Sequence, residues 1–475
     1  MDTGDIIVVP FPHPGHLFPA TELCLRLADR NCNVKFILPS ALSSISSALT
    51  LHPLVQTIDL PISDLIRIDP SFLDTDLPNF LSDFLSHRRA RSALPLCAVV
   101  DDIIGWISTT FHDFGVPSVS FFTSSAISSA VEHAISQIEP AIDPLPTTVP
   151  GLPEDVVLTA FDVAQKDHHR GYPPFGPSGK DGRSPRRRDI TSTNGAVGLI
   201  MNTCVDLEGP FLEYVARVAR KPVWAVGPLL PDRFFFRRVV ASPVRDEEVR
   251  ALREDNISEA DVHSWLDSKP RGSVIYVSFG SLVRPSDGEL VELAAGLEES
   301  ERPFLWAVQE GGRQHGPDGR WLEGEGGFFP EGLQESVGGR GMLIRGWAPQ
   351  LLILTHPATG GYLCHCGWNS TLEALCCGMP VMTWPVRGDQ LHNAKLLVNL
   401  LGVGVQLRAE PGKPVSREDV ARGIERLMTD DEMRNRAASV RSVFAKGLPR
   451  SSAAAFDAFL EFASSASGMK GKEGP

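Results

Sequence analysis

Residues 347–390 carry tryptophan, histidine, asparagine, serine, glutamate, aspartate and glutamine side chains between short apolar runs. In the centre of this span, an apolar run at 361–364 leads through a turn at 365–369 into a helical pattern that stops before Pro380. A strand, a tight turn and a helix N-terminus together form an anion cradle, because unpaired backbone N–H groups and the helix dipole both point at the turn. The pattern therefore predicts an anion-binding site.

Simpler explanations of the same residues stay open. Ser370 and Glu373 also spell an S-x-x-E capping box, which needs no ligand, and His365 alone could be a hydrogen-bonded structural histidine. The Cys364-His365-Cys366 run lacks paired C-x-x-C spacing and a second ligand cluster, so we expect no metal there. The chain has no G-x-x-x-x-G-K-[ST] loop, and no G-x-G-x-x-G motif follows its first predicted strand, which argues against a nicotinamide dehydrogenase.

The whole span resembles the signature box of plant secondary-product UDP-glycosyltransferases, which are family 1 glycosyltransferases. The resemblance implies that the Trp347 ring stacks on uracil, since a flat aromatic surface suits a flat base. It also implies hydrogen bonds to the edge of the base from backbone atoms near Ala348 and from the Gln350 side chain. Glu373 would accept hydrogen bonds from the ribose hydroxyls.

For the rest of the nucleotide sugar, the resemblance implies charge-assisted donors to the diphosphate and no metal cofactor. These donors are His365, the backbone N–H of Gly367, Asn369 and Ser370. Asp389 and Gln390 would bind the sugar hydroxyls. In the family, glutamine at this last position usually accompanies glucose and histidine accompanies galactose, while Trp368 is typical of glucose users. The expected donor substrate is therefore UDP-glucose.

A second set of candidates could supply the base for glycosyl transfer, because a hydroxyl attacks poorly until its proton begins to leave. His16 lies in the loop after the first predicted strand, and it matches the family's G-H arrangement, in which the histidine is the base. His13 is a less favoured candidate, and a helix-capping role for His16 stays open. Asp101 ends a predicted strand and aligns with the family's partner aspartate, which would orient the ring and stabilise its imidazolium. Asp102 is the alternative, although strand alternation sends it to the other face.

Two further site residues depend on the resemblance alone. Thr123 follows a predicted strand at 118–122 and matches the family's contact to the 6-hydroxyl of the sugar. Ser281 ends the V-S-F-G-S run at 277–281, a small-residue turn that in the family lets backbone and hydroxyl approach the phosphates. An ordinary strand-end turn explains Ser281 equally well. No hydrolase-type pair of carboxylates is needed, because the leaving UDP is already a stable anion.

Two series of βα units must position these residues. Apolar runs at 6–10 and 34–38 flank a helical pattern at 17–28 and form a βαβ unit. Further strands of the first series are predicted at 98–101, 118–122 and 198–201, and those of the second at 274–279, 304–308, 342–344, 361–364 and 381–384. The expected fold class is α/β. The resemblance implies a GT-B architecture, in which two Rossmann-like, doubly wound domains face each other across a cleft.

The domain boundaries follow from a change of composition between the two series. We assign residues 1–245 to an acceptor-binding domain that includes a linker from about 228, and residues 246–450 to a UDP-sugar-binding domain. A helix at 451–465 is expected to return to the first domain, as in the family, and 466–475 to form a disordered tail. The Gly-rich residues 309–328 are predicted to be a mobile surface loop. The arginine-rich residues 183–188 are predicted to be a solvated loop.

Composition excludes several classes of protein. The 475 residues are 42% hydrophobic and 22% charged, without an apolar run near 18 residues, so we expect a globular chain that does not insert into a membrane. A formal net charge of −13 argues against nucleic acid as a partner. The N-terminus is acidic and its apolar run is too short for a signal peptide, so we expect a cytoplasmic chain with its eight cysteines reduced. We also expect a monomer.

These features predict an inverting glucosyltransferase that moves glucose from UDP-glucose to a hydroxyl of a small plant metabolite and leaves a β-glucoside. The segments 223–230 and 344–347 resemble those of family members that glycosylate flavonoids and other small phenolics. Another UDP-sugar, a terpenoid or hormone acceptor and attack by carbon stay open, because the acceptor-binding loops at 65–90 and 140–195 do not align. A non-catalytic nucleotide-sugar-binding protein and a dehydrogenase are the alternatives from other classes, and the presence of both His16 and Asp101 argues against the first.

Overall fold

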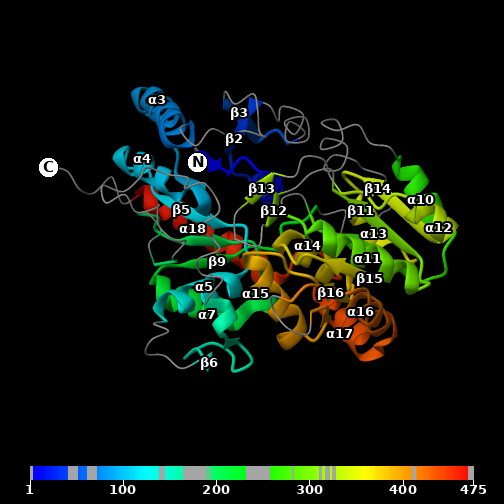
Figure 1. Ribbon diagram of the computed structural model, residues 1–475. Helices are drawn as coiled ribbons and strands as arrows, with labels where there is room; N and C mark the ends of the chain where they lie inside the picture. The colour runs from blue at the N-terminus through cyan, green and yellow to red at the C-terminus, as the bar shows by residue number, and fades with distance from the viewer. Residues whose placement is uncertain are drawn as a thin grey trace. The chain divides into compact units, whose positions relative to one another are not determined.

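The structure is a computed structural model, drawn as a ribbon in Figure 1. It describes residues 4–40, 52–60, 72–138, 145–163, 190–191, 193, 195–231, 257–280, 283–309, 313–315, 321–323, 328–408 and 413–468. Ser281, the arginine-rich residues 183–188, the linker residues 232–256 and the tail residues 469–475 lie outside these ranges. The chain divides into two compact units: unit 1 is Met1–Gln137, Tyr172–Pro231 and Leu448–Pro475, and unit 2 is Ile138–Gly171 and Asp232–Gly447.

Unit 1 is built on a seven-stranded parallel sheet with the strand order β3-β2-β1-β4-β5-β8-β9. Its strands are β1 (Ile6–Val9), β2 (Val34–Pro39), β3 (Val55–Leu60), β4 (Cys97–Asp101), β5 (Ser118–Phe122), β8 (Leu199–Met201) and β9 (Val223–Ala225). The chain order reverses at β1, which lies between β2 and β4. At such a switch point the loops after neighbouring strands diverge, and ligands bind in the crevice between them.

Helices cover both faces of this sheet. They are α1 (Pro14–Ala28), α3 (Leu77–Ala90), α4 (Ser108–Asp113), α5 (Ala126–Gln137), α7 (Val205–Ala219) and α18 (Arg450–Gly468), with shorter helical turns η2 (Phe72–Asp76) and η3 (Asp102–Ile107). Along β1, Ile6 and Val8 belong to the hydrophobic cluster that contains α1 and α18, while Ile7 and Val9 belong to the cluster that contains α3 and α4. The continuous apolar run of β1 thus reflects burial on both sides.

Unit 2 is built on a six-stranded parallel sheet with the order β14-β11-β10-β15-β16-β17. Its strands are β10 (Val274–Ser278), β11 (Phe304–Val308), β14 (Gly341–Arg345), β15 (Thr359–Cys364), β16 (Val381–Thr383) and β17 (Gly404–Gln406). Its helices are α10 (Glu259–Asp267), α11 (Asp287–Glu299), α12 (Leu333–Val337), α13 (Gln350–Thr355), α14 (Trp368–Cys377), α15 (Asp389–Lys395), α16 (Arg417–Thr429) and α17 (Asp431–Ser442), with the turns η5 (Gly338–Arg340) and η6 (Leu396–Leu400). Two parallel, helix-covered sheets confirm the predicted α/β class.

Three strands that the sequence did not predict lie at the edges of the two sheets: β3, β9 and β17. An edge strand has one pairing partner and can be short or partly polar, so it lacks the continuous apolar run that marks a central strand. The loop prediction for 309–328 was wrong in part, because β12 (Arg313–His315) and β13 (Trp321–Glu323) pair antiparallel there. A further short pair, β6 (Thr147–Thr148) and β7 (Val157–Leu158), lies in unit 2.

None of the helices in the described part of the chain is long and apolar enough to cross a bilayer.

The last helix, α18, packs on the edge of the unit 1 sheet, as the red segment beside β9 in Figure 1 shows. Phe456 and Phe459 have no exposed surface. The Trp224 ring of β9 lies 5.3 Å from the Phe459 ring and 5.0 Å from the Phe462 ring, measured between centroids. The C-terminal segment is thus part of the unit 1 core.

Replacing Phe459 with alanine should lower the free energy of unfolding by about 3–5 kcal/mol, because the change leaves a cavity between α18 and β9. Urea unfolding followed by tryptophan fluorescence measures the loss. Glu461→Ala, at an exposed position of the same helix, is the control and should leave the midpoint nearly unchanged. Equal stability of the two variants would contradict the packing role of α18.

Candidate functional site

The histidine and aspartate predicted to act together are brought into contact in unit 1. Strands β1 and β4 pair in parallel with Val9 opposite Val100, so the residues that follow them lie at one edge of the sheet. His16 lies in the first turn of α1, directly after β1, and Asp101 ends β4. The His16 Nδ1 atom is 2.8 Å from Asp101 Oδ2. The adjacency of two strands far apart in sequence therefore creates this pair.

The Asp101 carboxylate is fully buried and held on both of its oxygens. Oδ1 accepts the backbone N–H of Ile103 at 3.0 Å, which also caps η3. Oδ2 faces Nδ1 of His16, so the neutral imidazole carries its proton on Nδ1 and leaves a lone pair on Nε2. Nε2 has no hydrogen-bond partner among the described residues, and 16% of the side chain is exposed. The pair can therefore accept a proton from a bound hydroxyl and stabilise the resulting imidazolium.

Thr123 is a third member of this cluster. It directly follows β5, whose Phe121 pairs with Asp101, and its Oγ1 is 2.9 Å from Nδ1 of His16. The side chain is 7% exposed. The resemblance assigned Thr123 to the sugar, and the structure places its hydroxyl against the histidine.

The two alternative residues have other positions. His13 is the N-cap of α1, and its Nδ1 accepts the backbone N–H of Gly15 at 3.3 Å. The helix-capping role that stayed open for His16 therefore belongs to His13. Burial, followed by the charge of the neighbouring His16, lowers the pKa of His13 to about 3. Asp102 starts η3, and the carboxylate that contacts His16 is that of Asp101.

Because His13 is neutral in the folded protein at a pH where the unfolded chain takes up a proton, stability should fall as the pH drops from 6.5 towards about 3. Asparagine also caps helices but does not titrate. We therefore expect the free energy of unfolding to decrease less for His13→Asn than for the wild type when the pH is lowered from neutral to about 4. Urea unfolding at stepped pH measures this, and parallel pH profiles would contradict the lowered pKa.

In unit 2, β15 runs through residues 365–367 into α14, as predicted for the anion cradle. The capping-box explanation was wrong, because the N-cap of α14 is Gly367 and makes no side-chain cap. Ser370 and Glu373 instead lie inside the helix. Trp368 and Asn369 occupy its first turn, and Trp368 is 3% exposed. Helix α14 therefore begins where the predicted diphosphate-binding turn ends, and its N-cap residue makes no side-chain capping hydrogen bond.

The Gln350 side chain, at the start of α13, contacts Ser370 and Glu373 on α14. The Gln350 Nε2 atom donates to Ser370 Oγ at 3.0 Å and to Glu373 Oε2 at 2.6 Å. Gln350 Oε1 accepts from the hydroxyls of Tyr276 and Tyr362, each at 3.1 Å. The Gln350 amide thus fixes the orientation of the Glu373 carboxylate, which is 2% exposed. In this structure the amide is engaged by protein groups rather than presented to a base.

Sequence reasoning missed the two tyrosines of this cluster. Their rings stack with centroids 4.9 Å apart, because Tyr276 and Tyr362 pair on adjacent strands β10 and β15. Both lie within apolar runs that predict only a buried strand. The one available signal is a hydroxyl in a buried position, which must find a partner.

The ring of His365 packs against the backbone of two glycines, Gly280 and Gly367. A Cβ added to Gly280 would come 2.6 Å from His365 Nε2, and one added to Gly367 would come 2.5 Å from it. Gly280 also has a φ of +75°, which side chains other than glycine rarely adopt. The turn after β10 thus reaches the ring of His365, which is 8% exposed. Ser281, the next residue in that turn, lies outside the described residues.

Asp389 and Gln390 begin α15, directly after the loop that follows β16. The buried Asn393 donates to Asp389 Oδ2 at 3.1 Å and to the carbonyl of Cys366 at 2.9 Å, so it ties α15 to the 365–369 turn. Gln390 Oε1 accepts the backbone N–H groups of residues 386 and 387 at 2.8 and 3.0 Å. Its Nε2 has no partner in the described part of the chain, so its N–H groups can donate to a ligand.

The remaining predicted residues of the donor site follow β14. Trp347 is half-buried and Ala348 is 5% exposed, and both precede the Gln350 that starts α13. All eight cysteines are free thiols. Within unit 2, the structure therefore gathers the predicted residues at the carboxyl edge of one sheet, where parallel α/β folds bind ligands.

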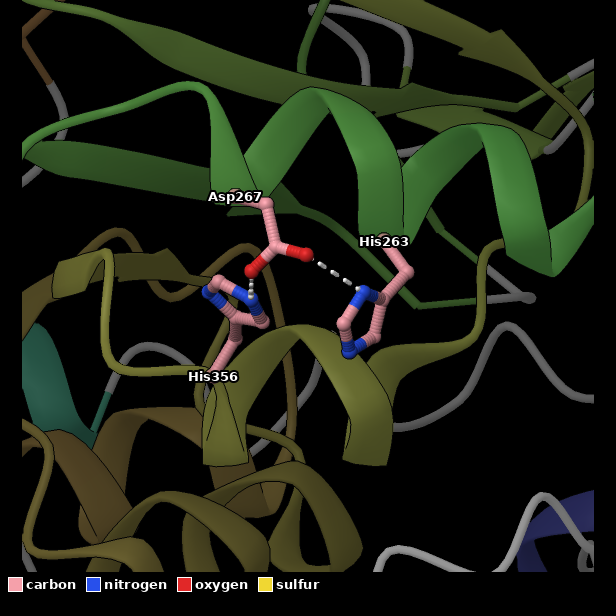
Figure 2. A group of neighbouring side chains, drawn as sticks. All are labelled: His263, Asp267 and His356. Atoms are coloured by element: carbon pink, nitrogen blue, oxygen red, sulfur yellow. Dashed lines mark hydrogen bonds and ion pairs between the residues drawn. The ribbon is translucent and has the colours of Figure 1, made fainter.

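One group of side chains outside these sites has the types that bind metals. Figure 2 shows His263 and Asp267 on α10 beside His356, which follows α13. Asp267 lies 3.1 Å from His263 Nδ1 and 3.2 Å from His356 Nε2. His356 Nδ1 accepts the backbone N–H of Ala358 at 3.2 Å, so the proton of the neutral ring lies on Nε2, which donates to Asp267. A metal on Nε2 would displace that proton and break this arrangement, so we interpret the group as a hydrogen-bond network.

Comparisons with known proteins point to one family. The family model "UDP-glucoronosyl and UDP-glucosyl transferase" matches residues 237–446. The abscisate β-glucosyltransferase of Phaseolus angularis is 31% identical over 94% of this chain and 93% of its own length, and the scopoletin glucosyltransferase of Nicotiana tabacum is 30% identical over 91% and 92%. The crystal structure of TcCGT1 in complex with UDP superimposes with a TM-score of 0.76 at 26% identity, covering 98% of this chain and 100% of that one.

A second similar structure was solved with two ligands bound. It is a Phytolacca americana glycosyltransferase complexed with UDP-2-fluoro-glucose and pterostilbene, with a TM-score of 0.69, 26% identity and coverage of 98% and 99%. With two parallel α/β sheets of seven and six strands, the chain has the GT-B fold of the plant UDP-glycosyltransferase structures. The chain belongs to the plant family 1 UDP-glycosyltransferases. It is a UDP-sugar-dependent glycosyltransferase of small plant metabolites.

Proposed function

We propose that this UDP-glycosyltransferase transfers glucose from UDP-glucose to a phenolic hydroxyl with inversion, with His16 as the general base. The observation that carries the proposal is the 2.8 Å contact between His16 Nδ1 and Asp101, which leaves Nε2 as the proton acceptor. Asp101 is a positioning residue, because it acts through the ring of His16. A neutral phenol needs such a base at neutral pH, and general base catalysis contributes about 10²–10⁴-fold in rate.

The reaction proceeds by direct displacement. The acceptor oxygen bonds to the anomeric carbon of glucose while its proton passes to Nε2 of His16. The bond between that carbon and the UDP oxygen breaks, and UDP leaves with the electron pair. Attack from the face opposite UDP converts the α-linked donor into a β-glucoside. The protonated imidazole is stabilised by the buried Asp101 carboxylate.

We assign the donor to unit 2 and the acceptor to unit 1. Trp347 and Ala348 would hold uracil, Glu373 the ribose, and Asp389 and Gln390 the sugar hydroxyls. The diphosphate would be held by His365, Gly367, Asn369, Ser370 and, outside the described residues, Ser281. The orientation of Glu373 by Gln350 supports the ribose assignment, since a fixed carboxylate accepts hydroxyl donors without reorganising.

The choice of acceptor rests on the relatives. One is named for scopoletin and another for anthocyanin, both of which carry phenolic hydroxyls, and a third is named for abscisate. A phenolic acceptor, which includes the flavonoids, is therefore the main proposal. A terpenoid acceptor is the second candidate. Mass spectrometry of products from UDP-glucose and a mixed panel of phenols and terpenoids tests both, and a panel without any glucoside would contradict them.

His16→Ala should lower the glucosyl-transfer rate by about 10²–10⁴-fold, because the acceptor proton then has no positioned base. The affinity for UDP, measured by calorimetry, should stay within twofold of the wild type. His112→Ala, at an exposed position of α4 in the same unit, is the matched control and should keep full activity. Retained activity in His16→Ala would remove His16 from the mechanism.

Gln390→His should lower the ratio of transfer from UDP-glucose to transfer from UDP-galactose by about tenfold. The physical reason is that histidine has no carbonyl oxygen to accept the two N–H groups of residues 386 and 387, so the donor aimed at the sugar moves. Initial rates with both donors at saturating acceptor measure the ratio. Gln406→His, at an exposed position of β17, is the control, and an unchanged ratio in both variants would contradict the assignment.

A further inference from the structure

The side chain of Glu208, on α7, has no exposed surface and contacts a second helix of unit 1. Its Oε2 atom accepts the backbone N–H of Ala126 at 3.0 Å, and its Oε1 atom accepts that of Ile127 at 2.8 Å. These are the first two residues of α5, and the N–H groups of a first helical turn have no partner within the helix. The Glu208 carboxylate therefore caps the N-terminus of α5, where the helix dipole favours a negative charge.

This cap is unusual because it comes from another helix and carries a buried charge. The hydroxyl of Ser125, directly before α5, already accepts the backbone N–H of Ser128 at 3.2 Å, as in an ordinary helix cap. No lysine, arginine or histidine side chain pairs with Glu208 in the part of the chain that the structure describes, and burial raises the pKa of its carboxyl. A carboxylate removed from water without a cation costs folding free energy, so the position is not optimised for stability alone.

The segment that carries Glu208 also holds the other end of the loop before α5. This loop, residues 123–125, begins where β5 ends at Phe122. The Phe122 carbonyl accepts the backbone N–H of Asn202 at 2.9 Å, and Asn202 directly follows β8, the strand that pairs with β5. Residues 202–208 thus bind the start of the loop through a backbone hydrogen bond and its end through the Glu208 carboxylate.

The first residue of this loop, Thr123, contacts the proposed base. Its Oγ1 atom is 2.9 Å from Nδ1 of His16, and the same nitrogen is 2.8 Å from Asp101 Oδ2. Two contacts at one ring nitrogen fix the plane of the imidazole, and with it the direction in which Nε2 points. The orientation of His16 therefore depends on the position of Thr123, which depends in turn on how the loop is held.

We propose that Glu208 is a positioning residue for glucosyl transfer, which fixes the loop 123–125 so that Thr123 holds the ring of His16 in its productive orientation. Glu208 contacts no substrate and acts through α5, Thr123 and His16 in turn. A misplacement of about 1 Å can lower a rate by about 10²-fold, so a buried side chain outside the site can change kcat. The inference rests on the proposed function, in which Nε2 of His16 takes the acceptor proton.

Glu208→Gln on the full chain is the first test, because the amide nitrogen of glutamine cannot accept one of the two backbone N–H groups and the end of the loop is loosened. With 4-methylphenol, which needs a base, kcat should fall by about tenfold. With 4-nitrophenol, which is largely ionised in mildly alkaline buffer, kcat should fall by less than about twofold. The Kd for UDP should not change. Glu213→Gln, at an exposed position of α7, is the matched control and should change none of these quantities.

A double-mutant cycle with Thr123→Val tests the route of the effect. Valine keeps the shape of threonine and removes the hydroxyl that contacts His16. If Glu208 acts through Thr123, the double variant should have the kcat of Thr123→Val alone, because the contact that Glu208 supports is already absent. A merely structural glutamate would lower kcat with both phenols by the same factor, and its loss would multiply with that of Thr123→Val. Either result would overturn the inference.

Glu208→Asp is the second variant, for the case in which Glu208→Gln does not remain folded in thermal unfolding. It keeps the charge but is one methylene shorter, so it should show the same larger loss with 4-methylphenol than with 4-nitrophenol. A kcat close to that of the wild type in every folded Glu208 variant would overturn this inference and leave the role of His16 intact. Retained transfer in His16→Ala, or a wild type that glucosylates neither phenol, would instead overturn the proposed function and this inference with it.

Discussion

The proposed chemistry depends on the hydrogen bond between His16 and Asp101, and the strand order of the unit 1 sheet makes this bond possible. The bond requires β1 and β4 to be neighbours, which places the loop after one strand against the end of the other. Asp101 has no exposed surface, and its second oxygen is occupied by the N–H of Ile103. A buried carboxylate held at both oxygens cannot turn away, so the imidazole keeps the tautomer that leaves Nε2 free to accept a proton.

Unit 2 follows the same physical rule with different side chains. Parallel strands bring polar residues that are distant in sequence to one edge, and the helices that follow lock them in place. Gln350 fixes Glu373, Asn393 ties α15 to the turn after β15, and glycines at 280 and 367 hold the ring of His365. These are contacts between the protein's own groups. Pre-ordering of this kind lowers the entropy cost of holding a flexible nucleotide sugar.

Several predictions from sequence agree with particular elements, and others fail for identifiable reasons. The central strands β1, β4, β5, β10, β11 and β15 were predicted because burial on both faces requires continuous apolar runs. The edge strands β3, β9 and β17 were missed because an edge imposes no such requirement. The capping box at Ser370 and Glu373 was wrong because the motif reports spacing, whereas the helix start is decided by the strand and turn before it. The two histidines near the N-terminus could be ranked from sequence, but only the structure shows that His13 is the helix cap.

Residue types and their spacing along the chain were enough to predict the family, the α/β class and the set of polar residues in the box from 347 to 390. Which site residues of each unit are in contact became clear only from the tertiary structure. Thr123 lies on His16 in unit 1, and Gln350 is engaged by two tyrosines and Glu373 in unit 2. These contacts join residues that are tens to hundreds of positions apart. Their occurrence depends on strand order and register, which local sequence patterns do not encode.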